Sequence, residues 1–303
     1  MNHPFILSCE STVDLPYSYV NGRDIPVIFY SYYIDEEEFP DDMHRDPQAL
    51  ERFYQQLKDG HLPTTSQINA FSYEEFFDEQ LQKGDLLHIA FSSGLTQSIR
   101  NAERAAERMR EKYPDRRIVV IDSLCGSCGY GMLVDGAADR RDEGCSLDEV
   151  AEWVMANRQR VHHEFFSTRL DFFKRSGRLS GPTAMLATVL NLCPVMRLDL
   201  DGHIVAYDKA RGKMGAIKAL VDTMEKHADG GRGYSGKCYI NHSSCPADAI
   251  KVLEAIRERF PRIAGEIRVF DIGTILASHC GPGTVAVYFM GDERTPSKSK
   301  EKK

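Results

Sequence analysis

The sequence predicts an α/β protein of two domains, with a mostly parallel sheet and flanking helices in the first and a mixed sheet in the second. Its 303 residues exceed the size at which one hydrophobic core usually keeps growing. The first half alternates short apolar runs with amphipathic stretches, as βα units do. After about residue 160 this alternation gives way to a less regular series of strands and helices. We predict domains at 1–160 and 161–291, and a disordered lysine-rich tail at 292–303.

In the first half, apolar residues at three- and four-residue spacing that stop at glycine or proline predict helices between the apolar runs. The last of these helices opens with Ser146 and Glu149, which is the signature of a capping box. Strands are expected at 5–9, 25–34, 86–91 and 117–122, and helices at 46–60, 72–84, 101–115, 129–144 and 146–163.

In the second half, Asp201-Gly202 between two alternating runs predicts a β-hairpin over 195–210. The small and aliphatic residues at 184–195 suit a buried helix or the wall of an apolar pocket, and core packing is the more common case. Further strands are expected at 163–170, 237–244, 266–273 and 283–291, and helices at 181–195, 213–229 and 245–260. These elements predict a mixed sheet.

The composition excludes several classes of protein. Apolar residues make up 42% of the chain and charged residues 27%, and no apolar run approaches the roughly 20 residues of a membrane span. The start of the sequence lacks the features of a signal peptide, so we expect a cytoplasmic protein. A net charge of -7 gives no basic surface for nucleic acid, and eight scattered cysteines suit free thiols.

Several predicted strands end in turns rich in hydroxyl groups and glycine. In an open parallel sheet, ligands bind beyond the carboxyl ends of the strands, where hydroxyls and backbone N–H groups can hold an anion. The turn at 92–96 is the most informative, because we expect a helix to begin directly after it and to direct its N-terminal N–H groups at the ligand. One such turn alone is more often a helix cap. The turns are Cys9-Glu10-Ser11-Thr12, Thr64-Thr65-Ser66-Gln67, Ser92-Ser93-Gly94-Leu95-Thr96 and Asp122-Ser123.

His279 precedes Cys280-Gly281-Pro282-Gly283 between two strand-like runs, so we expect it in a turn that a ligand can approach closely. A histidine can donate a hydrogen bond to a carboxylate, but a turn histidine without a function fits the sequence equally well. The other histidines, among them His162, His163 and His242, lack such a context and are interpreted as surface or packing residues.

Cys125 and Cys128 form a C-x-x-C pattern just after a predicted strand, which is typical of a redox motif or half a zinc site. A structural zinc site needs four ligands, and only His242 and Cys245 could complete this one. We interpret the two cysteines as packing residues of a turn and expect no metal ion. A thiol redox function is the less favoured alternative.

Taken together, these motifs resemble the DegV family over about residues 4–290. Each motif is short, but their order and spacing are specific. They are ESTVDLP at 10–16, PTTSQ at 63–67, SSGLT at 92–96, VIDS at 120–123 with Ser127, Gly129 and Gly131 after it, KRSGRLS at 174–180, NLCPVMRLDLDGHI at 191–204 and SHCGPGTVAVYF at 278–289. Three positions depart from the family pattern: Glu10 replaces an aspartate, and Ser176 and Gln97 replace glycines.

The resemblance implies a DegV-like fold that binds one long-chain fatty acid between its domains. Matched by position, the carboxylate would lie near Thr65, the turn Ser92-Ser93-Gly94, and His279. Ser66, Arg169 and Gly281 are further candidates, and Arg169 could instead contact a kinase. Members of this kind present the carboxylate to a separate fatty acid kinase, which makes an acyl phosphate for phospholipid synthesis. The chain would then need no catalytic residue and no cofactor, and its contact with a membrane surface would be transient.

An enzyme is the main alternative. The second domain of the family is similar to the substrate-binding part of dihydroxyacetone kinases, so His279 could act on a small carbonyl or acyl substrate. The sequence contains no GxxxxGK[ST] loop and no clustered carboxylates for Mg²⁺, so any phosphoryl transfer would depend on a partner.

Overall fold

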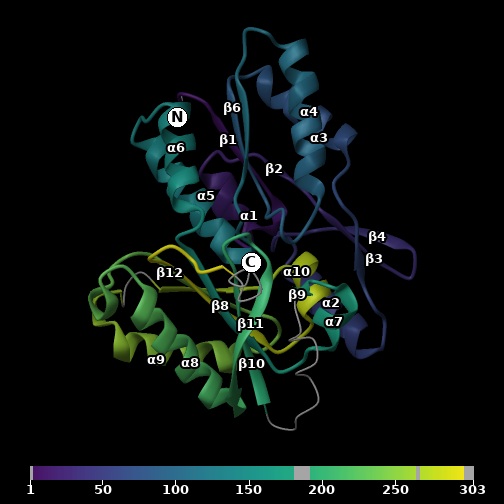
Figure 1. The fold of residues 1–303 in the computed structure, drawn as a ribbon. Coiled ribbons are helices and arrows are strands. Elements are labelled where there is room, and N and C mark those ends of the chain that lie inside the picture. Colours follow the sequence, from purple (N-terminus) through teal and green to yellow (C-terminus); the bar gives the residue numbers. More distant parts are fainter. Residues whose placement is uncertain (1–2, 181–191, 264–266, 297–303) are drawn as a thin grey trace, which may run out of the picture. The chain divides into compact units, whose positions relative to one another are not determined.

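The computed structural model describes residues 3–180, 192–263 and 267–296 (Figure 1). The chain divides into two compact units, Met1–Arg158 and Gln159–Lys303, hereafter unit 1 and unit 2. No helix in the described ranges is long and apolar enough to cross a membrane.

Unit 1 contains a four-stranded, fully parallel sheet, as the alternating pattern predicts. The strand order is β2-β1-β6-β7. Every residue of β6 is buried, which fits a central strand of a parallel sheet covered on both faces. The strands are β1 (Ile6–Glu10), β2 (Val27–Ile28), β6 (Leu86–Ala90) and β7 (Ile118–Asp122). Because they run in parallel, Glu10, Ala90 and Asp122 lie at one edge of the sheet, its carboxyl edge.

Helices cover both faces of this sheet, with α3 and α4 on one side and α5 and α6 on the other (Figure 1). The helices of unit 1 are α1 (Tyr17–Gly22), α2 (Ala49–Lys58), α3 (Ala70–Leu81), α4 (Ser98–Lys112), α5 (Ser127–Asp142) and α6 (Leu147–Asn157), with a 3-10 turn at Ser11–Val13. The predicted capping box is present, because Ser146 and Glu149 exchange side-chain and backbone hydrogen bonds. The α6 helix ends at Asn157, earlier than predicted, and the last three residues of the predicted helix, 161–163, instead begin a buried strand.

A small antiparallel sheet in unit 1 was only partly predicted. It consists of β3 (Ser31–Ile34), β4 (Glu37–Pro40) and β5 (Thr64–Thr65), in the order β4-β3-β5. The β4 strand is acidic and mostly exposed, so it lacks the apolar alternation that marks a strand. The turn before it uses Asp35 and Glu36 at positive φ, where a hairpin usually has Asn-Gly.

Unit 2 is built on a seven-stranded mixed sheet, which confirms the predicted class. Its order is β13-β12-β14-β8-β10-β11-β9, with parallel pairing only for β12 with β13 and β11 with β9. The predicted hairpin is the β10–β11 pair, whose turn contains Gly202 at φ 78°. The strands are β8 (Val161–Ser167), β9 (Leu179–Ser180), β10 (Leu192–Leu198), β11 (Ile204–Arg211), β12 (Cys238–His242), β13 (Ile267–Asp271) and β14 (Thr284–Met290).

The core of unit 2 lies where α8 and α9 pack against this sheet; Leu220, Val252 and Phe289 are among its fully buried side chains. The helices are α7 (Asp171–Ser176), α8 (Gly212–His227), α9 (Pro246–Arg259) and α10 (Thr274–Cys280), with 3-10 turns at Gly231–Gly233 and Pro261–Ile263.

Unit 2 differs from the predicted elements in three places. The predicted helix at 181–195, with the segment 184–195 inside it, falls largely outside the described residues, and its last four residues belong instead to β10. The α10 helix was missed, because it has only seven residues and buries most of them, which leaves no amphipathic stripe. The predicted start of the tail at 292 is too early, since Asp292 and Arg294 hydrogen-bond to His227 and Gln159.

Candidate functional site

The turn that follows β6 is fastened to the turn that follows β7. Ser92 N donates to the Cys125 carbonyl oxygen at 3.1 Å, and Ser93 N donates to Asp122 Oδ1 at 3.2 Å. Asp122 Oδ1 also accepts from Leu124 N at 2.9 Å. The two turns therefore meet at the carboxyl edge of the parallel sheet, where ligands bind in this class of sheet.

We expected a helix directly after the turn at 92–96, with free N–H groups aimed at a ligand, but the N–H groups of the turn are engaged. Gly94 N donates to Ser92 Oγ at 3.1 Å, and the N–H groups of Leu95 and Thr96 donate to the Ser92 carbonyl oxygen. The α4 helix begins only at Ser98. The N–H groups at 92–96 donate to Ser92 or to the turn after β7, so they do not supply an anion site at Ser93.

The two serines of the turn differ. Ser92 is fully buried, and its hydroxyl oxygen accepts the hydrogen bond from Gly94, so it shapes the turn. Ser93 is partly exposed, and within the described residues its hydroxyl makes no hydrogen bond. Ser93 is therefore the serine of the turn whose hydroxyl is available for a further hydrogen bond.

Thr65 lies in β5, where it pairs with Tyr32, and not in a turn at the edge of the parallel sheet. Ser66 N donates to the Ser31 carbonyl oxygen at 3.3 Å and continues this pairing. The segment is connected to α4 by a hydrogen bond of 3.2 Å from Ile68 N to Ser98 Oγ. The small antiparallel sheet thus positions Thr65, which the sequence pattern did not show.

A buried carboxylate lies beneath the turn. Glu10 is fully buried at the end of β1, and its carboxylate accepts from Tyr73 OH at 2.6 Å, Tyr30 OH at 3.1 Å and Phe91 N at 3.1 Å. His88 Nε2 lies 3.5 Å from Glu10 Oε1. Glu10 therefore supports the strand from which the turn emerges, and the longer side chain that departs from the family pattern points into the protein.

The tyrosines around Glu10 remain protonated donors. Burial, and next the negative charge of Glu10, raise the pKa of Tyr30 and Tyr73 well above the ordinary value. Sequence reasoning identified Glu10 as part of a strand-end turn and as a departure from the family pattern, and it did not identify Tyr30 or Tyr73. Their spacing in the chain gives no signal, because Glu10 lies in β1, Tyr30 in the link between β2 and β3, and Tyr73 in α3.

In unit 2, His279 lies in the last turn of α10 and not in a loop as predicted. The helix ends at Cys280 and is followed by Gly281, whose φ of 64° and ψ of -178° fall in a region that is essentially reserved for glycine. A Cβ at Gly281 would lie 2.2 Å from the ring of Phe172. Gly281 therefore acts through the backbone, by letting α10 pack closely on α7.

The surroundings of His279 are cationic. Burial, and next the charges of Arg178 and Arg175, lower the pKa of His279 to about 4, so the imidazole is neutral at pH 7. Arg175 Nη2 donates to the Ser278 carbonyl oxygen at 3.2 Å, which holds that guanidinium against α10. A neutral imidazole with two cationic neighbours forms a suitable environment for a carboxylate.

Arg169 differs from these arginines, because its charge is already neutralised. Its guanidinium donates to the Asp171 carboxylate at 3.1 and 2.6 Å, and it lies over the Phe172 ring at 5.3 Å. Nothing in this pairing favours Arg169 as a contact to a ligand.

Cys125 and Cys128 are fully buried free thiols. Cys125 Sγ donates to the Arg158 carbonyl oxygen at 3.2 Å, and Cys128 Sγ donates to the Asp14 carbonyl oxygen at 3.3 Å. Reactive cysteines are usually accessible, so this arrangement favours the packing interpretation over a redox function.

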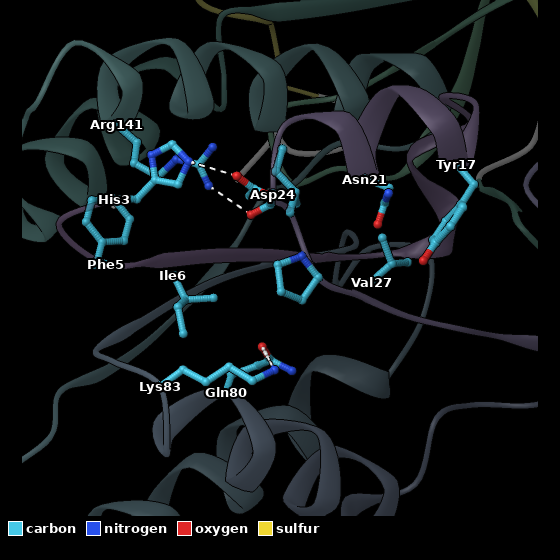
Figure 2. Close-up of a pocket in the computed structure, with 12 residues that line it drawn as sticks. His3, Phe5, Ile6, Tyr17, Asn21, Asp24, Val27, Gln80, Lys83 and Arg141 are labelled. Atoms are coloured by element: carbon cyan, nitrogen blue, oxygen red, sulfur yellow. Dashed lines mark hydrogen bonds and ion pairs between the residues drawn. The ribbon is translucent and has the colours of Figure 1, made fainter. Parts of the chain in front are cut away.

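A pocket of about 510 Å³ in unit 1 contains none of the predicted site residues (Figure 2). Its lining includes Ile6 and Val27, the first residues of β1 and β2, and Lys83, which precedes β6. His3 and Arg141 meet Asp24 at one end of it (Figure 2). This pocket therefore lies at the amino ends of the parallel strands, opposite the edge that carries Ser93.

Comparison with known proteins identifies the family. A family model described as "Uncharacterised protein, DegV family" matches residues 7–292. A DegV domain-containing protein of Clostridium perfringens is 35% identical over 295 residues, which cover 96% of this chain and 99% of that one. A second, from Streptococcus pyogenes, is 30% identical over 95% of this chain and 98% of its own. The chain therefore belongs to the DegV family.

Solved structures share the fold. A DegV family protein of Thermus thermophilus, described as fatty acid binding, superimposes with a TM-score of 0.83 at 26% identity, covering 95% of this chain and 99% of that one. DegV of Bacillus subtilis, described as a fatty acid binding protein, gives a TM-score of 0.81 at 22% identity, covering 96% of this chain and all of that one. The DegV-like α/β fold predicted from the motifs is confirmed.

Proposed function

We propose that this protein binds one long-chain fatty acid and acts as its carrier, without itself catalysing a reaction. The observation that carries this proposal is the match to the DegV family over residues 7–292, because the related structures from T. thermophilus and B. subtilis are described as fatty acid binding. The chemistry of the candidate residues in each unit is compatible with a carboxylate ligand.

In unit 2, the proposed contacts to the carboxylate come from His279, with Arg175 and Arg178 supplying positive charge. A neutral imidazole can still donate one hydrogen bond, and charge-assisted hydrogen bonds to a carboxylate are the strong ones. Gly281 contributes by the close packing of α10 on α7.

In unit 1, the proposed contacts come from the Ser93 hydroxyl and from Thr65, with Ser66 as a further candidate. Ser92 and Gly94 form the turn that presents Ser93. Because the backbone donors of this turn are engaged, its contribution to anion binding is one or two hydroxyl hydrogen bonds.

The acyl chain would provide most of the affinity. Burying each CH₂ contributes about 0.8 kcal/mol, and part of the sum is offset by the ordering of the chain and the loss of its translational freedom. The contacts to the carboxylate would then fix the orientation of the fatty acid.

A separate fatty acid kinase is the proposed partner. In the reaction, a carboxylate oxygen attacks the γ-phosphorus of ATP, the bond to the bridging oxygen breaks, and acyl phosphate and ADP form. The sequence has no phosphate-binding GxxxxGK[ST] loop, so the kinase must supply the nucleotide. ADP release should require kinase, fatty acid and this protein together; release that proceeds equally well without this protein would contradict the partnership.

Native mass spectrometry of the protein purified from cells tests the binding itself. We expect a mass increment that denaturation releases and extraction identifies as one fatty acid. A preparation that is always ligand-free and takes up no added fatty acid would overturn the proposal. An increment that matches a small carbonyl compound would favour the enzyme alternative.

Variants test whether the candidate residues of both units contact the same carboxylate. Ser93→Ala and His279→Ala should each weaken binding of a fatty acid about 10- to 100-fold, because a hydrogen bond to a charged group contributes about 1.5–3 kcal/mol, and the methyl ester should lose much less. A double-mutant cycle should show coupling between them. Equal losses for acid and ester would show that these residues only shape the pocket.

A further inference from the structure

We propose that His162, His227 and Asp292 form a binding site for one divalent transition-metal ion of the zinc type. These residues take no part in the proposed fatty acid binding, and the sequence alone gave them no role. Their ligand atoms lie within 4.8 Å of one another in unit 2.

The geometry of the three side chains suits a shared ion. Asp292 Oδ1 lies 3.1 Å from His162 Nε2 and 3.0 Å from His227 Nδ1. Ligand atoms about 2.0–2.2 Å from Zn²⁺ are separated from one another by distances of this order. The Asp292 carbonyl oxygen is also 3.0 Å from His162 Nε2, so a fourth potential ligand atom is close.

Three elements bring these residues together from distant parts of the chain. His162 is the second residue of β8, His227 is the last residue of α8, and Asp292 follows β14. Because β8 and β14 pair in antiparallel register, with His162 opposite Phe289, the start of one strand lies beside the end of the other.

The backbone around the three residues is fixed by hydrogen bonds. Asp292 N donates to the His227 carbonyl oxygen at 3.0 Å, and Gly291 N donates to the Arg160 carbonyl oxygen at 3.0 Å. A Cβ at Gly291 would lie 2.2 Å from the His227 carbonyl oxygen, so only glycine permits this approach. The site is therefore largely organised before any ion binds.

The His162 ring is held in one orientation. It stacks on the Phe289 ring at 4.9 Å and on the His227 ring at 5.2 Å. Its second nitrogen, Nδ1, lies 3.7 Å from the carboxylate of Glu164, which is almost completely buried. At 3.7 Å this contact is longer than a hydrogen bond; once shortened, it would form the carboxylate–histidine pair that recurs at metal sites, which keeps the proton on the rear nitrogen and leaves the front lone pair for the metal.

The ligand set indicates the class of ion. Two imidazoles and one carboxylate suit Zn²⁺ and neighbouring divalent ions better than Mg²⁺ or Ca²⁺, which prefer oxygen ligands alone. His162 and His227 are mostly buried, while the Asp292 side chain is 60% exposed and provides the route of entry.

A bound ion would join β8, α8 and the segment after β14, so it should stabilise unit 2. The competing explanation is that the three side chains form a hydrogen-bonded cluster that binds no metal ion. The effect of added Zn²⁺ on the protein distinguishes the two explanations.

The experiment is a Zn²⁺ titration of the full-length protein, without a histidine tag and stripped of metal, followed by calorimetry and thermal unfolding. We expect one Zn²⁺ per chain and a rise in Tm, since an ion that binds only the folded state stabilises it. Co²⁺ should give visible absorption bands without the charge-transfer band of a thiolate ligand, which separates this site from binding by cysteines.

Asp292→Asn and His227→Gln should each weaken Zn²⁺ binding at least tenfold, and Glu164→Gln should do so about 10- to 100-fold. Because Asp292 is exposed, the Asp292→Asn variant should fold, so it still tests the site if His227→Gln unfolds. His203→Gln is the control, because Asp199, Asp201 and His203 form another candidate group in the described residues. No stoichiometric uptake, or uptake lost in His203→Gln and retained in Asp292→Asn, would overturn the proposal.

Discussion

The candidate ligand-binding residues of the two units differ in charge. In unit 1, Ser93 offers an uncharged hydroxyl, and the nearby side chains that support its turn and strand include the carboxylates of Asp122 and Glu10. In unit 2, two guanidinium groups lie near a histidine whose imidazole is neutral. The candidate residues of unit 2 should therefore attract an anion more strongly than those of unit 1, which can offer directional hydrogen bonds.

The two groups are also supported differently. The turn of unit 1 depends on buried polar hydrogen bonds, whereas α10 of unit 2 depends on a glycine that allows close packing. These differences predict which substitutions in each unit should lower stability or fatty acid affinity.

The largest effect is expected for Glu10→Ala, which leaves two tyrosine hydroxyls and one backbone N–H buried without their acceptor. A buried unsatisfied donor costs about 1–3 kcal/mol, so the free energy of unfolding should fall by roughly 3–5 kcal/mol. Urea denaturation followed by circular dichroism measures it. Glu79→Ala, which removes an exposed carboxylate paired with Lys83, is the matched control and should change stability by less than about 0.5 kcal/mol. Similar losses of stability for both variants would show that Glu10 does not support the turn.

Gly281→Ala should follow, with a loss of about 3 kcal/mol from backbone strain and from the clash with Phe172. Gly177→Ala is the matched control in the same unit, because Gly177 has a φ of 65° but nothing within 4 Å of an added Cβ. The control should cost about 1 kcal/mol, since left-handed backbone is strained but accessible to alanine. The difference between the two Tm values measures the packing of α10 on α7, and equal values would show that only the backbone angle matters.

The neutral histidine of unit 2 predicts a dependence of stability on pH. The pKa of His279 is lowered from 6.5 to about 4, so between these values the unfolded chain binds more protons than the folded one. This contribution is fully present above pH 6.5, is lost as the pH falls toward 4, and amounts to no more than about 3 kcal/mol. As the pH falls from 6.5 to 4, the His279→Gln variant should lose less stability than the wild-type protein. A pKa near 6.5 for His279, measured by NMR in the ligand-free protein, would contradict this prediction.

The smallest effect concerns the arginines. Arg178→Gln and Arg175→Gln should each weaken fatty acid binding about 3- to 10-fold, more at low salt, because partly solvated charges contribute about 1 kcal/mol. Each should also raise the pKa of His279. Arg169→Gln removes the same charge from a residue already paired with Asp171 and should change affinity by less than about twofold. Equal effects of all three variants would show that only the net charge of the protein matters.

The sequence by itself determined the fold class, the βα alternation of unit 1, the hairpin at Gly202, the capping box at Ser146 and the family. These features depend on periodicity, on turn residues and on motifs read in order along the chain. These features are local, so short stretches of the sequence contain the information that determines them.

Tertiary structure decided the rest. The N–H groups of the turn at Ser93 find acceptors in the turn itself and in Asp122, Thr65 lies in a strand, and His279 lies in a short buried helix. Glu10 meets Tyr30 and Tyr73, and Asp292 meets His162 and His227, across separations of up to 130 residues. Such contacts arise from the packing of distant elements, which no short window of sequence contains.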